Sequence, residues 1–215
     1  MNTIEAIKSR RSVRAFSDTP VEKEKIDAIL EAAVWTPSWA NSQPWEIFVA
    51  SGETLDRIKA GFKEKHENKE KPFFETPAPA AWSEAAKDRQ KQLRPGMVAA
   101  CGEEAADDFA MLNRTAFNAP MVIYLCMDKI LSEWSLYDIG AYSQSLMLAA
   151  KELGLGTIPA AQLMLFPDVL RKEMDIPENL KFTIGIAIGY EDTEHGINKF
   201  KATRSPLSET VRFFE

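Results

Sequence analysis

The stretch YDIGAYSQSLMLAAKELG, residues 137–154, decides how this chain folds. Its apolar and small residues occur on nearly every side of a helix, so the pattern predicts a long helix over Tyr137–Leu153 that is buried on most sides. Gly154 follows at the position where a glycine commonly ends a helix. We therefore expect a fold built around a central helix.

Strands and shorter helices are predicted around this helix. Apolar runs predict buried strands over 120–127 and 182–189, and residues 45–50 predict another strand. The order Thr19-Pro20-Val21-Glu22 is typical of a capping box that begins a helix. Helices and strands intermix without a regular βαβ repeat, so the sequence predicts one α+β domain over residues 1–215.

The composition excludes several classes of protein. A net charge of -6 and a pI near 5.2 argue against a general affinity for nucleic acid or anionic lipid. The two cysteines, Cys101 and Cys126, lack the spacing of metal ligands, so we expect no metal site. No apolar stretch is long enough to span a membrane, and we predict a cytoplasmic protein without a membrane partner.

Basic residues concentrate in one short segment of this acidic chain. Arg10, Arg11 and Arg14 surround Ser12, and guanidinium groups together with a hydroxyl match the oxygens of a terminal phosphate. A local cluster whose charge is opposite to that of the whole protein favours a small anionic ligand. A solvated basic patch is the alternative that the spacing leaves open.

Two other segments carry groups that suit a flat heterocyclic ligand. In the loop 36–45, two prolines fix the backbone, while Asn41 and Gln43 offer donors and acceptors. The segment 154–162 has two glycines and small residues that let backbone N–H groups approach a ligand. The alternatives are a core role for Trp45, and a simple helix end followed by a turn at the glycines.

No motif assigns catalysis to a side chain of the protein. The dinucleotide fingerprint Gly-x-Gly-x-x-Gly, the Walker loop and the hydrolase elbow Gly-x-Ser-x-Gly are absent. His66 and His195 lie in charged stretches and are interpreted as surface residues. We therefore predict no general acid or nucleophile, and any nicotinamide would bind transiently.

Taken in order, several segments of the chain resemble the nitroreductase family. They are Arg10-Arg11-Ser12-Val13-Arg14-Ala15-Phe16, Pro37-Ser38 with Asn41-Ser42-Gln43-Pro44-Trp45, Gly154-Leu155-Gly156-Thr157, and Gly185-Ile186-Ala187-Ile188-Gly189-Tyr190 ahead of Arg204-Ser205-Pro206-Leu207. The resemblance covers residues 4–50 and about 118–212. The segment from about 62 to 117 has no counterpart in the shorter members, and we interpret it as a variable helical and irregular insertion near the active site.

The resemblance implies a mixed β-sheet surrounded by helices, a buried central helix, and a homodimer with swapped C-terminal arms and FMN at the subunit interface. The residues that would hold the FMN phosphate are Arg10, Ser12 and Arg14, with Arg11 nearby and Arg204 joining from the tail. The residues of the other subunit that would contact the flavin ring are Pro37, Ser38, Trp39, Asn41 and Gln43. Along the reactive edge of the ring would lie Ala160, Ala161 and Gln162.

The implied reaction is ping-pong: NADH or NADPH donates a hydride and leaves, and a nitroaromatic, quinone or similar electron-poor small molecule takes its place. A fold does not fix a reaction. The alternatives are therefore flavin chemistry of another kind, such as dehalogenation, enone reduction or flavin fragmentation, and FMN binding without turnover. A colourless protein that binds a phosphate ligand through its arginines is a further alternative.

Overall fold

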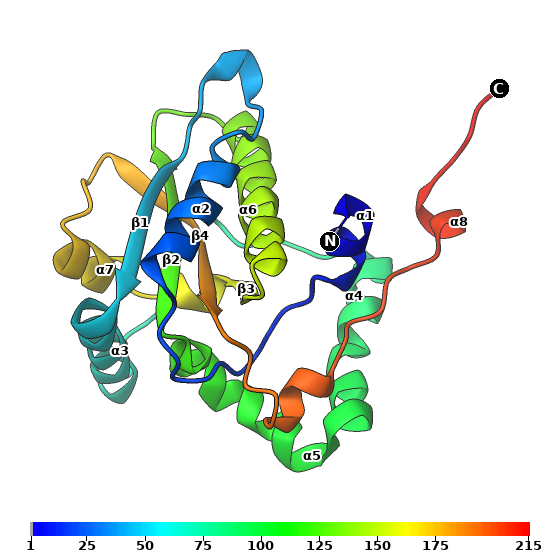
Figure 1. Cartoon of the computed structure of the whole chain (residues 1–215), viewed down its shortest axis with the longest axis horizontal. Helices are drawn as coiled ribbons and strands as arrows, with labels where there is room; N and C mark the ends of the chain where they lie inside the picture. Colours follow the sequence, from blue (N-terminus) through cyan, green and yellow to red (C-terminus); the bar gives the residue numbers. More distant parts are fainter. Residues whose placement is uncertain (1) are drawn as a thin grey trace.

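One β-sheet lies at the centre of the fold, with helices on both of its faces (Figure 1). A computed structural model describes residues 2–215. The strands are β1 (Glu46–Ser51), β2 (Met121–Asp128), β3 (Gly156–Ala160) and β4 (Leu180–Gly189). The α-helices are α1 (Thr3–Ser9), α2 (Lys23–Ala33), α3 (Gly52–Glu67), α4 (Glu84–Lys91), α5 (Leu93–Arg114), α6 (Trp134–Glu152), α7 (Pro167–Met174) and α8 (Leu207–Thr210). Short 3-10 turns are η1 (Trp39–Asn41), η2 (Ala116–Asn118), η3 (Ala161–Met164) and η4 (Gly196–Lys199).

The four strands lie in the order β1-β2-β4-β3, and every neighbouring pair is antiparallel. Ser51 at the end of β1 pairs with Met121 at the start of β2. Helix α6 then carries the chain from the end of β2 back to the end of the sheet where β2 began, because Gly156 of β3 pairs with Gly189 and Met121 pairs with the neighbouring Ile188. The predicted α+β fold is confirmed. The expected mixed sheet is corrected to an antiparallel one, and the parallel contact in the described chain is an isolated bridge from Ser12 to Thr157.

Each face of the sheet has its own hydrophobic core, because side chains alternate along a strand. In β2, Val122 and Tyr124 belong to the core that contains α3, α5 and α7. Ile123 and Leu125 belong to the opposite core, formed with α2 and α6. Burial on both faces explains why β2 is a continuous apolar run.

Helix α6 is the predicted central helix. Leu146 and Ala150 are fully buried in the core shared with α2 and the sheet. The first turns are more open than the pattern predicts, since Trp134 is 69% and Tyr137 79% exposed. No helix of residues 2–215, α6 included, is long and apolar enough to cross a membrane.

The capping box predicted at Thr19 does not form. Helix α2 begins at Lys23, and its N-cap residue, Glu22, makes no side-chain capping bond. The Glu22 carboxylate instead accepts a hydrogen bond from the hydroxyl of Tyr190 at 2.6 Å. A contact with the distant end of β4 replaces the expected local one.

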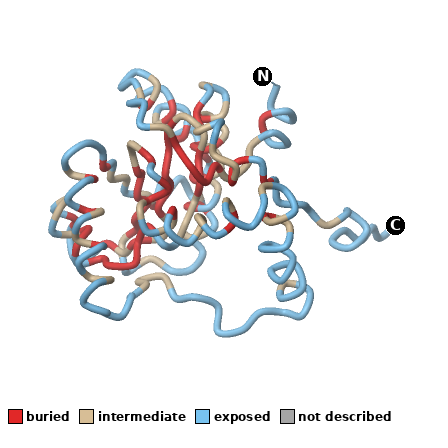
Figure 2. The backbone as a smooth tube through the Cα atoms, turned by 90° about the horizontal axis from the view of Figure 1, so that it is seen from below, coloured by how far each residue is buried: buried red, intermediate tan, exposed pale blue. Residues whose placement is uncertain are grey.

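Two segments extend from the sheet and its covering helices. The irregular stretch after α3 is anchored by Glu75, which pairs with Arg171 at 2.7 Å, both side chains being almost buried. After η4, the tail runs away from the body of the molecule (Figures 1 and 2). It ends in Phe213 and Phe214, which are 88% and 93% exposed. The two aromatic side chains at the end of the tail are therefore not packed against the rest of the described chain.

Candidate functional site

A basic cavity of about 790 Å³ lies between the N-terminal segment, α6 and the C-terminal tail. Its described lining residues include Lys151 of α6 and Lys201 of the tail, and none of them is acidic. The structure brings together here all the residues predicted to hold a phosphate, namely Arg10, Arg11, Ser12, Arg14 and Arg204. The cavity is therefore suited to an anion.

Two guanidinium groups in this cavity have donors without acceptors. Nη1 of Arg10 and Nε of Arg14 are buried and have no hydrogen-bond partner among the described residues. Burial, and then the charge of Arg204, lowers the pKa of Arg10. Burial, and then the charge of Arg11, lowers the pKa of Arg14 to about 10. A bound phosphate would supply both acceptors and negative charge, so these residues fit a phosphorylated cofactor.

The backbone around Arg14 is fixed from two sides. The amide of Val13 donates to the carbonyl of Thr157 in β3 at 3.0 Å. The amide of Arg14 donates to Oδ1 of Asn198, which is 184 residues away in the sequence, at 2.8 Å. The guanidinium carbon of Arg14 then lies 4.9 Å from the ring centre of Phe200. These contacts hold the cation at the cavity wall.

Arg11 is engaged differently from its neighbours. Its Nη1 donates to the carbonyl of Asn198 at 2.6 Å, and its Nη2 pairs with the carboxylate of Glu191. Because this charge already has a protein partner, Arg11 has less capacity for an anion than Arg10 and Arg14. The sequence spacing makes the three arginines look equivalent. The structure distinguishes them, because Arg11 has partners in the protein while Arg10 and Arg14 each keep a buried donor without an acceptor in the described chain.

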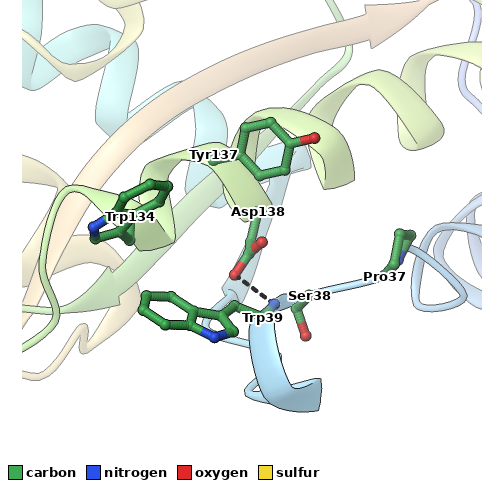
Figure 3. Close-up of a pocket in the computed structure, with 6 residues that line it drawn as sticks. All are labelled: Pro37, Ser38, Trp39, Trp134, Tyr137 and Asp138. Carbon is green, nitrogen blue, oxygen red and sulfur yellow. Dashed lines mark hydrogen bonds between the residues drawn. The ribbon is translucent and has the colours of Figure 1, made fainter.

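A second cavity, of about 570 Å³, lies between the loop after α2 and the first turns of α6 (Figure 3). The residues that line it are Pro37, Ser38, Trp39, Trp134, Tyr137 and Asp138. We call it the aromatic cavity. It contains three of the five residues predicted to contact a flavin ring, while Asn41 and Gln43 are exposed further along the loop. Trp45, which could have joined them, packs against the core of α2 and α6.

The loop that carries these residues has an uncommon backbone. Ala40, Asn41 and Gln43 have φ angles of 50°, 57° and 45°, a region that residues other than glycine rarely adopt. The hydroxyl of Ser38 accepts a hydrogen bond from the amide of Gln43 at 2.9 Å and closes the turn. Strained residues of this kind cluster at binding and catalytic sites.

Helix α6 holds the loop through one carboxylate. The amide of Trp39 donates to Oδ2 of Asp138 at 3.2 Å (Figure 3). The rings of Trp39 and Trp134 meet edge to face with their centres 5.6 Å apart. The aromatic cavity thus combines apolar walls with a carboxylate at its base.

The residues predicted along the reactive edge of the flavin ring lie away from both cavities. Ala160 ends β3, and Ala161 and Gln162 begin η3. Gln162 borders a small space that it shares with Lys59 and Phe62 of α3. None of these three residues lines the basic or the aromatic cavity. Within one chain, the phosphate, ring and edge groups therefore occupy separate places.

Several lining residues escaped the sequence analysis. Trp134 and Asp138, in the first turns of α6, line the aromatic cavity. Lys151, near the end of the same helix, lines the basic cavity. An aspartate inside an otherwise apolar helix is a signal that could have drawn attention to the first turns. No local pattern predicts that Lys151 and Lys201 line the same cavity, because they come from α6 and from the tail, which are far apart in the sequence.

Comparison with known proteins gives one consistent family. The profile of the nitroreductase family matches residues 7–190. Nitroreductase NfnB of Mycolicibacterium smegmatis is 31% identical, over 96% of this chain and 90% of its own. The 4-nitrobenzoate reductase of Nocardioides is 29% identical, over 96% and 87% of the two chains.

A solved structure of similar sequence has the same fold. The FMN-dependent nitroreductase NfnB of Mycobacterium smegmatis, in complex with NADPH, superposes with a TM-score of 0.91 and is 30% identical, over 99% of this chain and 97% of its own. The profile covers most of the chain and includes the arginine segment, the loop after α2 and the end of β3. By sequence and by fold, this chain belongs to the nitroreductase family.

Proposed function

We propose that this chain is an FMN-dependent oxidoreductase that carries electrons from NADPH or NADH to nitroaromatics, quinones or similar electron-poor small molecules. The observation that carries the proposal is the basic cavity, in which Arg10 and Arg14 have buried donors without acceptors. The phosphate of FMN would provide those acceptors. The similar nitroreductase NfnB of M. smegmatis is FMN-dependent and was solved in complex with NADPH, which supports the same cofactors for this chain.

The proposed roles follow from charge and exposure. Arg10, Ser12, Arg14 and Arg204 bind the phosphate, and Arg11 keeps its partner Glu191 and supports the segment. Pro37, Ser38, Trp39, Asn41 and Gln43 contact the ring, and the reactive edge meets Ala160, Ala161 and Gln162. Lys151 and Lys201 add positive charge to the cavity.

We also propose that the working form is a homodimer with FMN at the subunit interface, and that the whole chain is one domain of that dimer. The ring-contact loop and the basic cavity lie apart in one chain, and a second copy would supply the loop to each cavity. The exposed aromatic side chains of the tail, Phe213 and Phe214, would then be covered. The segment 62–117 remains a proposed border of the active site, and a cytoplasmic location remains a prediction.

FMN, when bound, supplies the redox chemistry, accepting a hydride from the nicotinamide and passing electrons to the acceptor. The chain anchors the phosphate, orients the ring and leaves space for one flat molecule at a time. No side chain is assigned as general acid or nucleophile. The test is the pair of half-reactions of the FMN-loaded protein, reduction by NADPH and reoxidation by a nitroaromatic, followed separately and without oxygen. A protein that binds FMN without being reduced would instead be a non-catalytic flavin binder.

A further inference from the structure

The aromatic cavity has one charged group among its six described lining residues, the carboxylate of Asp138. Trp39, Trp134 and Tyr137 supply flat apolar walls, and their exposed fractions of 66%, 69% and 79% leave the rings accessible. A volume of about 570 Å³ is in the range of small-molecule sites. The cavity therefore suits a flat aromatic molecule, and its electrostatics depend on one side chain.

Asp138 is fixed in this position. It is 3% exposed, and its Oδ2 accepts the hydrogen bond from the amide of Trp39 at 3.2 Å. It forms no ion pair with lysine, arginine or histidine in the described part of the chain. The amide dipole stabilises the carboxylate, but no cation neutralises it. A negative charge in these apolar surroundings acts more strongly on a bound molecule than it would in water.

We propose that Asp138 is a specificity-determining residue that selects against acceptors bearing a negative charge, so that the acceptors of this enzyme are neutral or cationic nitroaromatics. The inference rests on the proposed function. A carboxylate on the ring of an acceptor would be desolvated by the three aromatic walls and repelled by Asp138. A neutral ring would keep the same stacking contacts without either penalty.

The test compares two acceptors of similar size and different charge, 4-nitrobenzoate and 4-nitrobenzamide. For the FMN-loaded wild type, we measure kcat/KM for each with saturating NADPH, and expect the amide to be favoured by about tenfold or more. In Asp138→Asn, the side-chain oxygen still accepts from Trp39 while the charge is gone. The kcat/KM for 4-nitrobenzoate divided by the kcat/KM for 4-nitrobenzamide should then rise about tenfold. Comparing this ratio between proteins cancels the different intrinsic reactivity of the two acceptors.

Two further variants keep the test decisive. Asp56→Asn on the exposed side of α3 removes the same charge far from the cavity and should leave the ratio unchanged. Tyr137→Lys adds a cation at the exposed rim and should raise the ratio even if the Asp138 variant does not fold. If wild type, Asp138→Asn and Tyr137→Lys all reduce 4-nitrobenzamide and have the same ratio of kcat/KM values, the proposed charge selection is overturned. The proposed function would still stand in that case. A wild type that reduces neither acceptor contradicts the proposed function itself.

Discussion

At the residue scale, the basic cavity holds cations in surroundings that disfavour their charge. The pKa of Arg10 and that of Arg14 are both lowered, mainly by burial. Arg14 is still protonated at neutral pH, because its pKa of about 10 lies well above 7. A side chain kept charged, buried and short of acceptors destabilises the free protein and favours an anionic ligand.

Arg14→Gln should therefore separate ligand binding from folding. The dissociation constant of FMN should rise about ten- to a hundredfold, as expected for losing a hydrogen bond to a charged group. The melting temperature of the FMN-free protein should not fall, because a buried cation with an unpaired donor is removed. Titration of flavin fluorescence and thermal unfolding measure the two quantities.

The matched control is Lys172→Gln, which removes a cation that is 82% exposed on α7. It should leave FMN affinity unchanged. If both variants weakened FMN equally, general charge rather than the cavity would account for binding, and the role given to Arg14 would be wrong.

At the scale of elements, strand β3 positions the arginine segment. Ser12 bridges to Thr157, and the amide of Val13 bonds to the same residue. A Cβ added at Gly156 would lie 2.6 Å from Cγ2 of Val13, so β3 and the segment touch without room for a methyl group. The glycine therefore serves close packing next to the basic cavity.

Gly156→Ala should push this segment away from β3. We expect a loss of about 1–3 kcal/mol in the free energy of unfolding, as for other overpacked sites, together with weaker FMN binding. Chemical denaturation and FMN titration measure the two effects. Gly140→Ala is the control, because beyond the adjacent backbone of α6 the added Cβ would meet no heavy atom within 4 Å. Unchanged FMN affinity in Gly156→Ala would contradict the positioning role of β3.

The elements themselves were largely predictable, and their tertiary contacts were not. Continuous apolar runs identified β2, β4 and the middle of α6, because burial on both sides leaves a strong pattern in the sequence. The predicted start of α2 was wrong, because the Glu22 carboxylate accepts a hydrogen bond from Tyr190 instead of completing a capping box with Thr19. The arginine segment was visible as a local cluster. The role of Asp138 in the aromatic cavity was not visible in the sequence, because this cavity forms only where α6 meets the loop after α2.

At the scale of the whole molecule, exposed aromatic side chains mark the surfaces that we propose a second copy covers. Phe213 and Phe214 end a tail that leaves the body of the chain (Figure 2). Apolar surface of this kind indicates an interface, because isolated in water it is unfavourable.

Replacing Phe213 and Phe214 together by Ala should weaken the proposed homodimer without unfolding the chain, because neither side chain packs in a core of the described chain. Sedimentation velocity over a range of concentrations should show dissociation at concentrations where the wild type is dimeric. A wild type that sediments as a monomer, or a double variant with unchanged association, would contradict the role of the tail.

An anaerobic absorbance spectrum can show whether this chain binds FMN and cycles it between NADPH and a nitroaromatic acceptor. The purified protein is mixed with FMN, freed of unbound flavin, and followed first with NADPH and then with nitrobenzene. We expect a bound flavin spectrum that bleaches with NADPH and returns with nitrobenzene. Protein that stays colourless after FMN addition, or flavin that NADPH and NADH leave oxidised, would contradict the proposed function.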